Sequence, residues 1–137
     1  MITINKYKAK QLDEWDEFID ASNNGTIFQK QSFINYHKDR EFIDNSLIIN
    51  NNNNPVAVLP AVIKNNILYS HPGSSYGGLV LSQNIEFSII NDIIHALDTY
   101  CVNKNLNSIF LINSPCIYHK ELDHALDYLL QWNHFQN

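Results

Sequence analysis

One glycine-rich stretch decides how this chain folds: Ser70-His71-Pro72-Gly73-Ser74-Ser75-Tyr76-Gly77-Gly78-Leu79-Val80-Leu81. It holds three of the four glycines in the 137 residues, and it ends in an apolar segment at 79–81. Glycine accepts unusual backbone conformations and lets another backbone come close, so this clustering indicates a constrained loop at a strand edge. One interpretation is a tight turn with a bulge in an antiparallel sheet. The other, which the order of the surrounding elements favours, is a ligand-facing loop whose free backbone N–H groups hold a polar substrate.

The middle of the chain is predicted to be all strand. Two Asn-rich turns, at 50–54 and 65–66, predict an antiparallel meander of strands at 46–49, 55–64 and 67–70. Residues 78–81 add a fourth extended piece after the glycine loop. Pro60 falls inside the second strand, where it indicates an edge or a bulge because proline has no N–H for a sheet ladder.

Both ends of the chain show apolar residues at helical spacing. Helices are predicted at 9–21, 31–37, 85–103 and 118–134, strands at 2–7 and 107–112, and a short extended piece at 26–28. The apolar 107–112 segment is typical of a central strand. The order predicts one α+β domain over residues 1–137, with helices on both faces of a mixed, mainly antiparallel sheet. The predicted core includes Trp15, Phe18, Ile90, Ile94, Phe110, Leu126 and Leu130.

Composition and charge exclude several classes of protein. The hydrophobic content of 45% argues against a disordered chain. The net charge of −5, with no Lys/Arg stripe, argues against a nucleic-acid protein. We find no apolar run long enough for a membrane span and no signal-peptide pattern, so we expect a soluble, cytoplasmic protein.

The histidines and cysteines argue against a metal site. His119 and His124 are five residues apart. On a helix they would point about 140° apart, unlike an i,i+4 ligand pair. Cys101 and Cys116 have no partners at ligand spacing, and we expect both to be small core residues of a reduced protein.

Three segments carry a resemblance to a known family. Trp15-Asp16-Glu17-Phe18, followed by Asn24-Gly25-Thr26-Ile27-Phe28-Gln29, resembles the entry segment of the Fem-type branch of the GNAT acyltransferases. Tyr76-Gly77-Gly78-Leu79-Val80 resembles the glycine strand of that branch, and 110–120 resembles the strand and loop after its long helix. The branch includes peptidoglycan bridge-forming aminoacyl transferases and amino-sugar N-acetyltransferases. Its members usually carry two GNAT-like halves, of which this chain resembles the first.

The resemblance implies an acyl- or aminoacyl-transferase domain that acts on an amine of an amino sugar or cell-envelope precursor, with acetyl-CoA or another acyl-CoA as donor. In GNAT proteins a glycine-rich turn opens the long helix and holds the pyrophosphate. Here that position reads Leu81-Ser82-Gln83-Asn84-Ile85-Glu86-Phe87-Ser88, without glycine and with an acidic residue. We therefore expect weak acyl-CoA binding. The alternative function is a non-catalytic binding or partner-pairing half-domain that has lost the acyl-CoA site.

Candidate site residues lie in and near the glycine loop. His71 is a candidate general base, because its ordinary pKa suits deprotonation of an amine near neutral pH, or else a loop histidine bonded to backbone. Tyr76 either donates to a sugar or amine or caps the sheet. The predicted substrate-binding residues are Ser74, Ser75, Gly77, Gly78, Tyr118, His119 and Lys120. For His119 and Lys120 the alternative is a solvated helix start.

The last predicted helix ends in two large aromatic residues, Trp132 and Phe135. One interpretation is that they fold back onto the sheet. The other is that they anchor an interface, because aromatic anchors are enriched at protein contacts. We predict a homodimer, or pairing with a second half-domain, with this helix at or near the contact.

Overall fold

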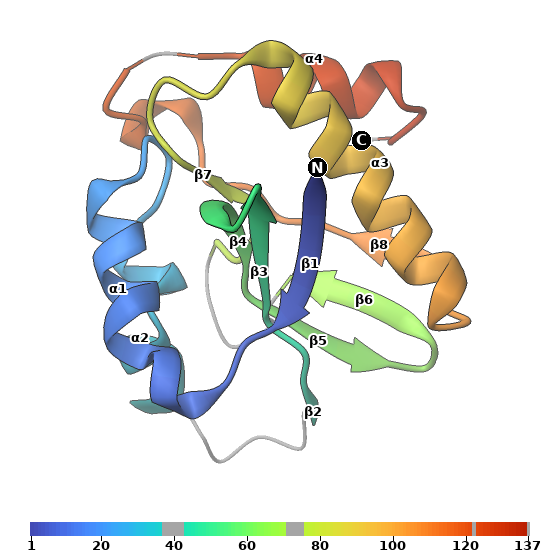
Figure 1. Cartoon of the computed structure of the whole chain (residues 1–137), viewed down its shortest axis with the longest axis horizontal. Helices are drawn as coiled ribbons and strands as arrows, with labels where there is room; N and C mark the ends of the chain where they lie inside the picture. The colour runs from blue at the N-terminus through green and yellow to red at the C-terminus, as the bar shows by residue number, and fades with distance from the viewer. Residues whose placement is uncertain (37–42, 71–75, 122, 137) are drawn as a thin grey trace.

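The computed structural model describes residues 1–36, 43–70, 76–121 and 123–136, and it has an α+β architecture with helices on both sides of the strands (Figure 1). The strands are β1 (Ile2–Lys6), β2 (Ile43–Asp44), β3 (Leu47–Asn51), β4 (Asn54–Leu59), β5 (Ala61–Lys64), β6 (Ile67–Ser70), β7 (Val80–Leu81) and β8 (Ser108–Phe110). The α-helices are α1 (Leu12–Ala21), α2 (Gln31–Tyr36), α3 (Phe87–Asn103) and α4 (Ala125–Trp132), with 3-10 turns η1 (Ala9–Gln11), η2 (Ile27–Gln29) and η3 (Cys116–Tyr118).

The strands form two four-stranded sheets, in the orders β1-β3-β4-β7 and β2-β5-β6-β8. All neighbours are antiparallel except β6 and β8, which are parallel. The hairpins β3–β4 and β5–β6 turn through Asn52–Asn53 and Asn65–Asn66. All four asparagines have positive φ, between 50° and 70°. Two such residues in a row match the type I′ turn that suits the twist of a hairpin.

Pro60 is where the meander passes from one sheet to the other. It is buried between β4 and β5, and it cannot continue a ladder because it has no N–H. Around it the Asn45 N–H donates to the Ala61 carbonyl at 2.8 Å, and the Ala61 N–H donates to the Ser46 hydroxyl at 3.3 Å. The predicted single strand at 55–64 is therefore two strands in different sheets.

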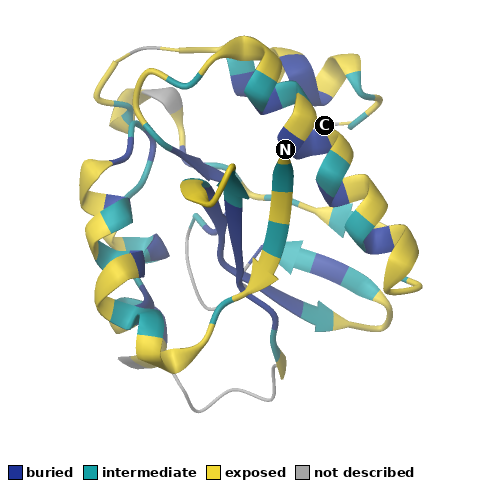
Figure 2. Ribbon diagram, viewed as in Figure 1, coloured by how far each residue is buried: buried dark blue, intermediate teal, exposed yellow. Residues whose placement is uncertain are grey.

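The core lies on both faces of the first sheet (Figure 2). Since side chains alternate along a strand, Leu47, Ile49 and Leu59 pack with α3 and α4, whereas Ile48, Val58 and Val80 pack with α1. Trp15 closes the α1 side, where its indole N–H donates to the Gln29 carbonyl at 2.8 Å. Helices on both faces of a mainly antiparallel arrangement confirm the predicted fold class.

Several local predictions need correction. Residues 27–29 form a 3-10 turn and not an extended piece, since Thr26 and Gln29 make a capping box. The last helix begins at Ala125 and not at 118, because the segment before it is bonded to Asn23. The strand predicted at 107–112 is β8, which lies at an edge and not at the centre of its sheet.

The core prediction is confirmed for Trp15, Ile90, Ile94, Leu126 and Leu130, all of them buried. Phe18 is half-buried, and it packs against the α1 cluster. Phe110 is 54% exposed, so its predicted burial is wrong. On an edge strand its neighbour Ile109 faces the core, and Phe110 points outward beside Tyr69, with ring centroids 5.7 Å apart. In the parts that the structure describes, no helix has the length and apolarity to cross a membrane.

Candidate functional site

Asn24 joins three segments of the chain at the edge of β7. Its side chain is 4% exposed. Its Nδ2 donates to the Leu79 carbonyl at 2.8 Å, and its Oδ1 accepts the Leu81 N–H at 2.7 Å. The Ser114 hydroxyl donates to the Asn24 carbonyl at 2.6 Å. A side-chain carboxamide offers a donor and an acceptor, as a peptide group does. The Asn24 side chain therefore pairs with the edge of β7 that does not face β4.

Asn23 holds the segment that precedes α4. Its Nδ2 donates to the Glu121 carbonyl at 3.0 Å, while the Glu121 N–H donates to its Oδ1 at 2.8 Å. The Lys120 N–H donates to the Asn23 carbonyl at 2.9 Å, and the Asn23 N–H donates to the Leu81 carbonyl at 3.1 Å. Asn23 therefore links the end of β7 to the segment that leads into α4.

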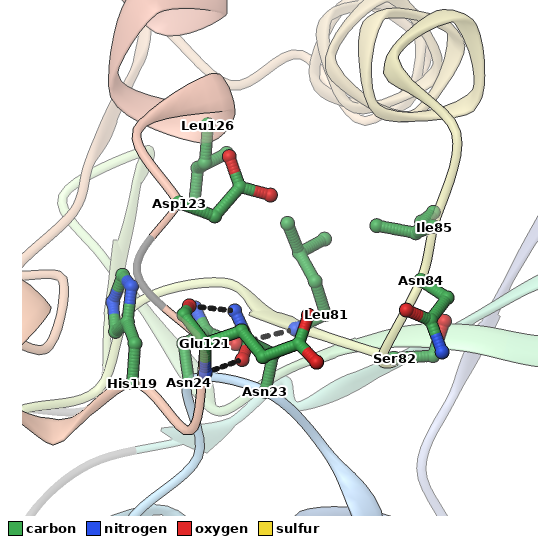
Figure 3. Close-up of a pocket in the computed structure, with 10 residues that line it drawn as sticks. All are labelled: Asn23, Asn24, Leu81, Ser82, Asn84, Ile85, His119, Glu121, Asp123 and Leu126. Atoms are coloured by element: carbon green, nitrogen blue, oxygen red, sulfur yellow. Dashed lines mark hydrogen bonds between the residues drawn. The ribbon is translucent and has the colours of Figure 1, made fainter.

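A cavity of about 190 Å³, which we call the α3/α4 pocket, opens where these segments meet (Figure 3). Its walls come from the link between β7 and α3 and from the segment leading into α4. The lining residues are Asn23, Asn24, Leu81, Ser82, Asn84, Ile85, His119, Glu121, Asp123 and Leu126. Leu81, Ile85 and Leu126 make the apolar part, and the polar groups surround it (Figure 3).

The α3/α4 pocket has an acidic polar lining. Glu121 and Asp123 contribute two carboxylates, and no Lys or Arg is among its lining residues in the described chain. One Asp123 oxygen accepts the Ala125 N–H at 2.8 Å at the start of α4. His119 Nδ1 is buried and has no hydrogen-bond partner among the described atoms. A cavity lined by carboxylates attracts cations and repels anions.

The start of α3 is the place where the GNAT resemblance puts the pyrophosphate of an acyl-CoA, and the residues there do not fit that group. Asn84 has a φ of 58°, and Glu86 is the exposed N-cap, with no side-chain capping bond. A pyrophosphate needs backbone N–H groups of a glycine-rich turn and nearby positive charge. Here it would meet Glu86, Glu121 and Asp123 instead.

The glycine loop is only partly described. His71, Ser74 and Ser75 lie outside the described residues. The Gly77 and Gly78 N–H groups both donate to the Ile112 carbonyl, at 3.1 and 2.9 Å, so the prediction that they are free for a substrate is wrong. Position 78 requires glycine because the backbone at Asn113 comes close to it. A Cβ on Gly78 would lie 2.6 Å from the Asn113 Cα. In the described chain no glycine has positive φ.

The other predicted site residues lie in three different surroundings. Tyr76 is half-buried, and its ring packs against Phe28 and Tyr118, with centroids 5.7 Å apart in both pairs. His119 lines the α3/α4 pocket. Lys120 turns away, because its ammonium donates to the Asp20 carbonyl at the end of α1. The structure therefore places His119 in the pocket and leaves Lys120 outside it.

Sequence reasoning missed most of the pocket. Of its lining residues only His119 was a predicted site residue, and Asn23, Asn24, Glu121 and Asp123 were not expected there. The signal that could have found them is two adjacent asparagines directly after an amphipathic helix, since buried asparagines usually bond to backbone. Among the described residues, no group of three or more His, Cys, Asp or Glu side chains is placed to hold a metal ion. The Cys116 side chain lies outside the description.

The fold resembles that of solved structures, one of which is an N-acetyltransferase. The ribosomal-protein-S18-alanine N-acetyltransferase from Escherichia coli matches with a TM-score of 0.54 and 8% identity. The match covers 80% of this chain and 64% of that chain, which is less than two thirds of its length. A single-residue variant of TTHA1254 from Thermus thermophilus matches with a TM-score of 0.50 and 10% identity, over 98% of this chain and 89% of that one. No family model and no curated protein sequence matches this chain.

At these identities the likeness shows the fold alone, and that fold is the GNAT acetyltransferase fold. The fold that the resemblance implies is confirmed. The Fem-type branch, the amino-sugar substrate and the dimer stay predictions.

Proposed function

We propose that this chain, an acyltransferase-type domain by its fold, binds the amine of a small amino sugar or cell-envelope precursor and does not itself hold an acyl-CoA. It would then be a non-catalytic, Fem-type half-domain that presents or retains the amine substrate. The observation that carries this proposal is the lining of the α3/α4 pocket, where Glu121 and Asp123 face a small cavity with no Lys or Arg among its lining residues as described.

The size and charge of the pocket support an amine over a cofactor. Ligand sites for drug-sized molecules measure about 300–1,000 Å³. The cavity of about 190 Å³ suits an ammonium group and the ring that bears it. A protonated amine gains a charge-assisted hydrogen bond from each carboxylate that it reaches. An acyl-CoA would bring its pyrophosphate against the same carboxylates, which is why we expect weak binding of acetyl-CoA.

Calorimetry with matched ligands tests the proposal. We expect saturable binding of glucosamine, and about tenfold weaker binding of N-acetylglucosamine, which has the same ring without the charge. Glu121→Gln should weaken glucosamine binding, whereas Glu17→Gln, an exposed carboxylate on α1, should leave it unchanged. Equal binding of the two sugars refutes amine recognition. A low-micromolar dissociation constant for acetyl-CoA refutes the loss of the acyl-CoA site.

The proposal extends to association through α4. Trp132 is 68% exposed and stacks on Tyr128, with centroids 6.4 Å apart and planes at 15°. Phe87, at the start of α3, lies 6.0 Å from Tyr128 and is 52% exposed. These three rings form an aromatic row that would suit a homodimer or a second half-domain. Phe135 is half-buried against the core, so it is not part of that surface.

A further inference from the structure

The outer edge of β8 carries no neighbouring strand in the part of the chain that the structure describes. β8 pairs on one side with β6, in the register Ile67–Ser108, Leu68–Ile109 and Tyr69–Phe110. Proteins usually blunt such an edge with charged residues or proline, because its unpaired backbone groups accept another strand. Residues 108–112 contain neither, and Phe110 and Ile112 are 54% and 46% exposed.

A groove runs along this edge. Two cavities of about 540 and 430 Å³ share the lining residues Ile109, Phe135 and Gln136, and together they follow the chain from Ser108 to Asn113. The opposite wall is the end of α4 and the residues just after it. The apolar groups in this β8 groove include Leu106, Ile109, Leu130 and Phe135. An exposed edge beside an apolar groove is the arrangement that proteins use for strand addition.

The charge of the β8 groove indicates what kind of partner would bind there. Asp98 lines one of the two cavities and Asp127 lines the other. Neither cavity has a Lys or Arg among its lining residues, counting the described part of the chain. A second copy of this chain, with its net charge of −5, is a poor electrostatic match for an acidic groove. A basic segment is a good one.

We propose that the β8 groove binds an extended segment of another protein as an added strand on β8, with apolar and basic residues together on the face of that strand that turns toward α3 and α4. Since every second side chain of a strand lies on one face, apolar side chains in the middle of that face would contact Ile109 and Phe135, and basic ones at its ends would reach Asp98 and Asp127. The backbone of the segment would pair with the free edge. This inference is independent of the amine pocket, which lies at the start of α3 and the start of α4.

The test uses the full chain and a fluorescent heptapeptide with lysine at positions 1 and 7, valine at positions 3 and 5, and threonine at positions 2, 4 and 6, so that lysine and valine share one face of the strand. We expect saturable binding with a dissociation constant of about 10–100 μM, and backbone amide NMR shifts concentrated at 108–113. N-methylation of alternate backbone amides keeps every side chain but removes half of the donors, and it should weaken binding about tenfold. A peptide with glutamate in place of lysine should bind at least about tenfold more weakly.

Two matched variants locate the site on the protein. Phe110→Lys should weaken peptide binding about tenfold, whereas Ile27→Lys, which replaces a similarly exposed apolar residue on η2, should leave it unchanged. An unchanged amide spectrum away from residue 110 shows that the variant is folded. The inference is overturned by no saturable binding up to about 1 mM, or by equal binding of the N-methylated or the glutamate peptide. Self-association through β8, seen as concentration-dependent shifts at 108–113, would overturn it in favour of a second copy.

Discussion

Replacing Asn24 with alanine should destabilise this domain strongly, although Asn24 lies in no helix or strand. The change leaves two buried backbone groups without partners, the Leu79 carbonyl and the Leu81 N–H, which Asn24 now bonds at 2.8 and 2.7 Å. An unsatisfied buried polar group costs about 1–3 kcal/mol, so the loss of two partners should lower the free energy of unfolding by about 2–6 kcal/mol. That is a large share of the roughly 5–15 kcal/mol that holds an ordinary domain folded.

Urea denaturation, followed by the fluorescence of the buried Trp15, measures this loss. Asn23→Ala is the matched control, because its side-chain bonds to Glu121 are exposed to water and their loss should cost less than about 1 kcal/mol. Asn24→Asp keeps the acceptor for Leu81 but places an oxygen against the Leu79 carbonyl, so it should also destabilise. If Asn24→Ala costs no more than Asn23→Ala, the reasoning that Asn24 acts as a strand neighbour of β7 is wrong.

Three further outcomes are expected. Leu126→Ala should lower the free energy of unfolding in urea by about 2–5 kcal/mol, because this side chain is 8% exposed and packs in the main core; a loss below about 0.5 kcal/mol would contradict that packing. Burial, with a smaller effect of Asp98, raises the pKa of the Cys101 thiol from 9.0 to about 11. The folded thiol therefore stays protonated where the unfolded one ionises, so between pH 9 and 11 the wild type should lose up to about 2 kcal/mol more stability than Cys101→Ala; parallel pH curves would contradict this. Light scattering at tens of micromolar should show a dimer for the wild type and a monomer for Trp132→Ala, and a wild-type monomer ends the homodimer proposal.

Patterns that act over a few residues predicted most of the fold. Apolar spacing placed α1 and α3 within a few residues, and the Asn-rich turns at 50–54 and 65–66 marked both hairpins. These predictions succeeded because helix faces and two-residue turns depend on neighbours in the sequence. Phe110 failed for the opposite reason. An apolar strand has the same composition at the centre and at the edge of a sheet, and only the pairing with other strands decides its exposure.

The pocket depends still more on distant contacts. Asn23 meets Glu121 across 98 positions of sequence, and Asn24 meets Leu81 across 57. No local pattern in either segment predicts that meeting. The glycine pair at 77–78 was correctly expected to allow a close approach, but the group that approaches is the 112–113 segment of the same chain and not a ligand.

The passage of the chain between the two sheets at Pro60 also sets an order of folding events. Each hairpin, β3–β4 and β5–β6, closes through two asparagines already suited to the turn, and such hairpins form in about 1–10 μs. The pairings that complete the sheets join β1 to β3 and β6 to β8, across some 40 or more residues, and loop closure over such distances is slower. Pulse-labelled hydrogen exchange should therefore protect the two hairpins as separate early units, on either side of a proline, before the edges of either sheet become protected. Early protection of β1 or β8 would show that the distant pairings nucleate folding instead.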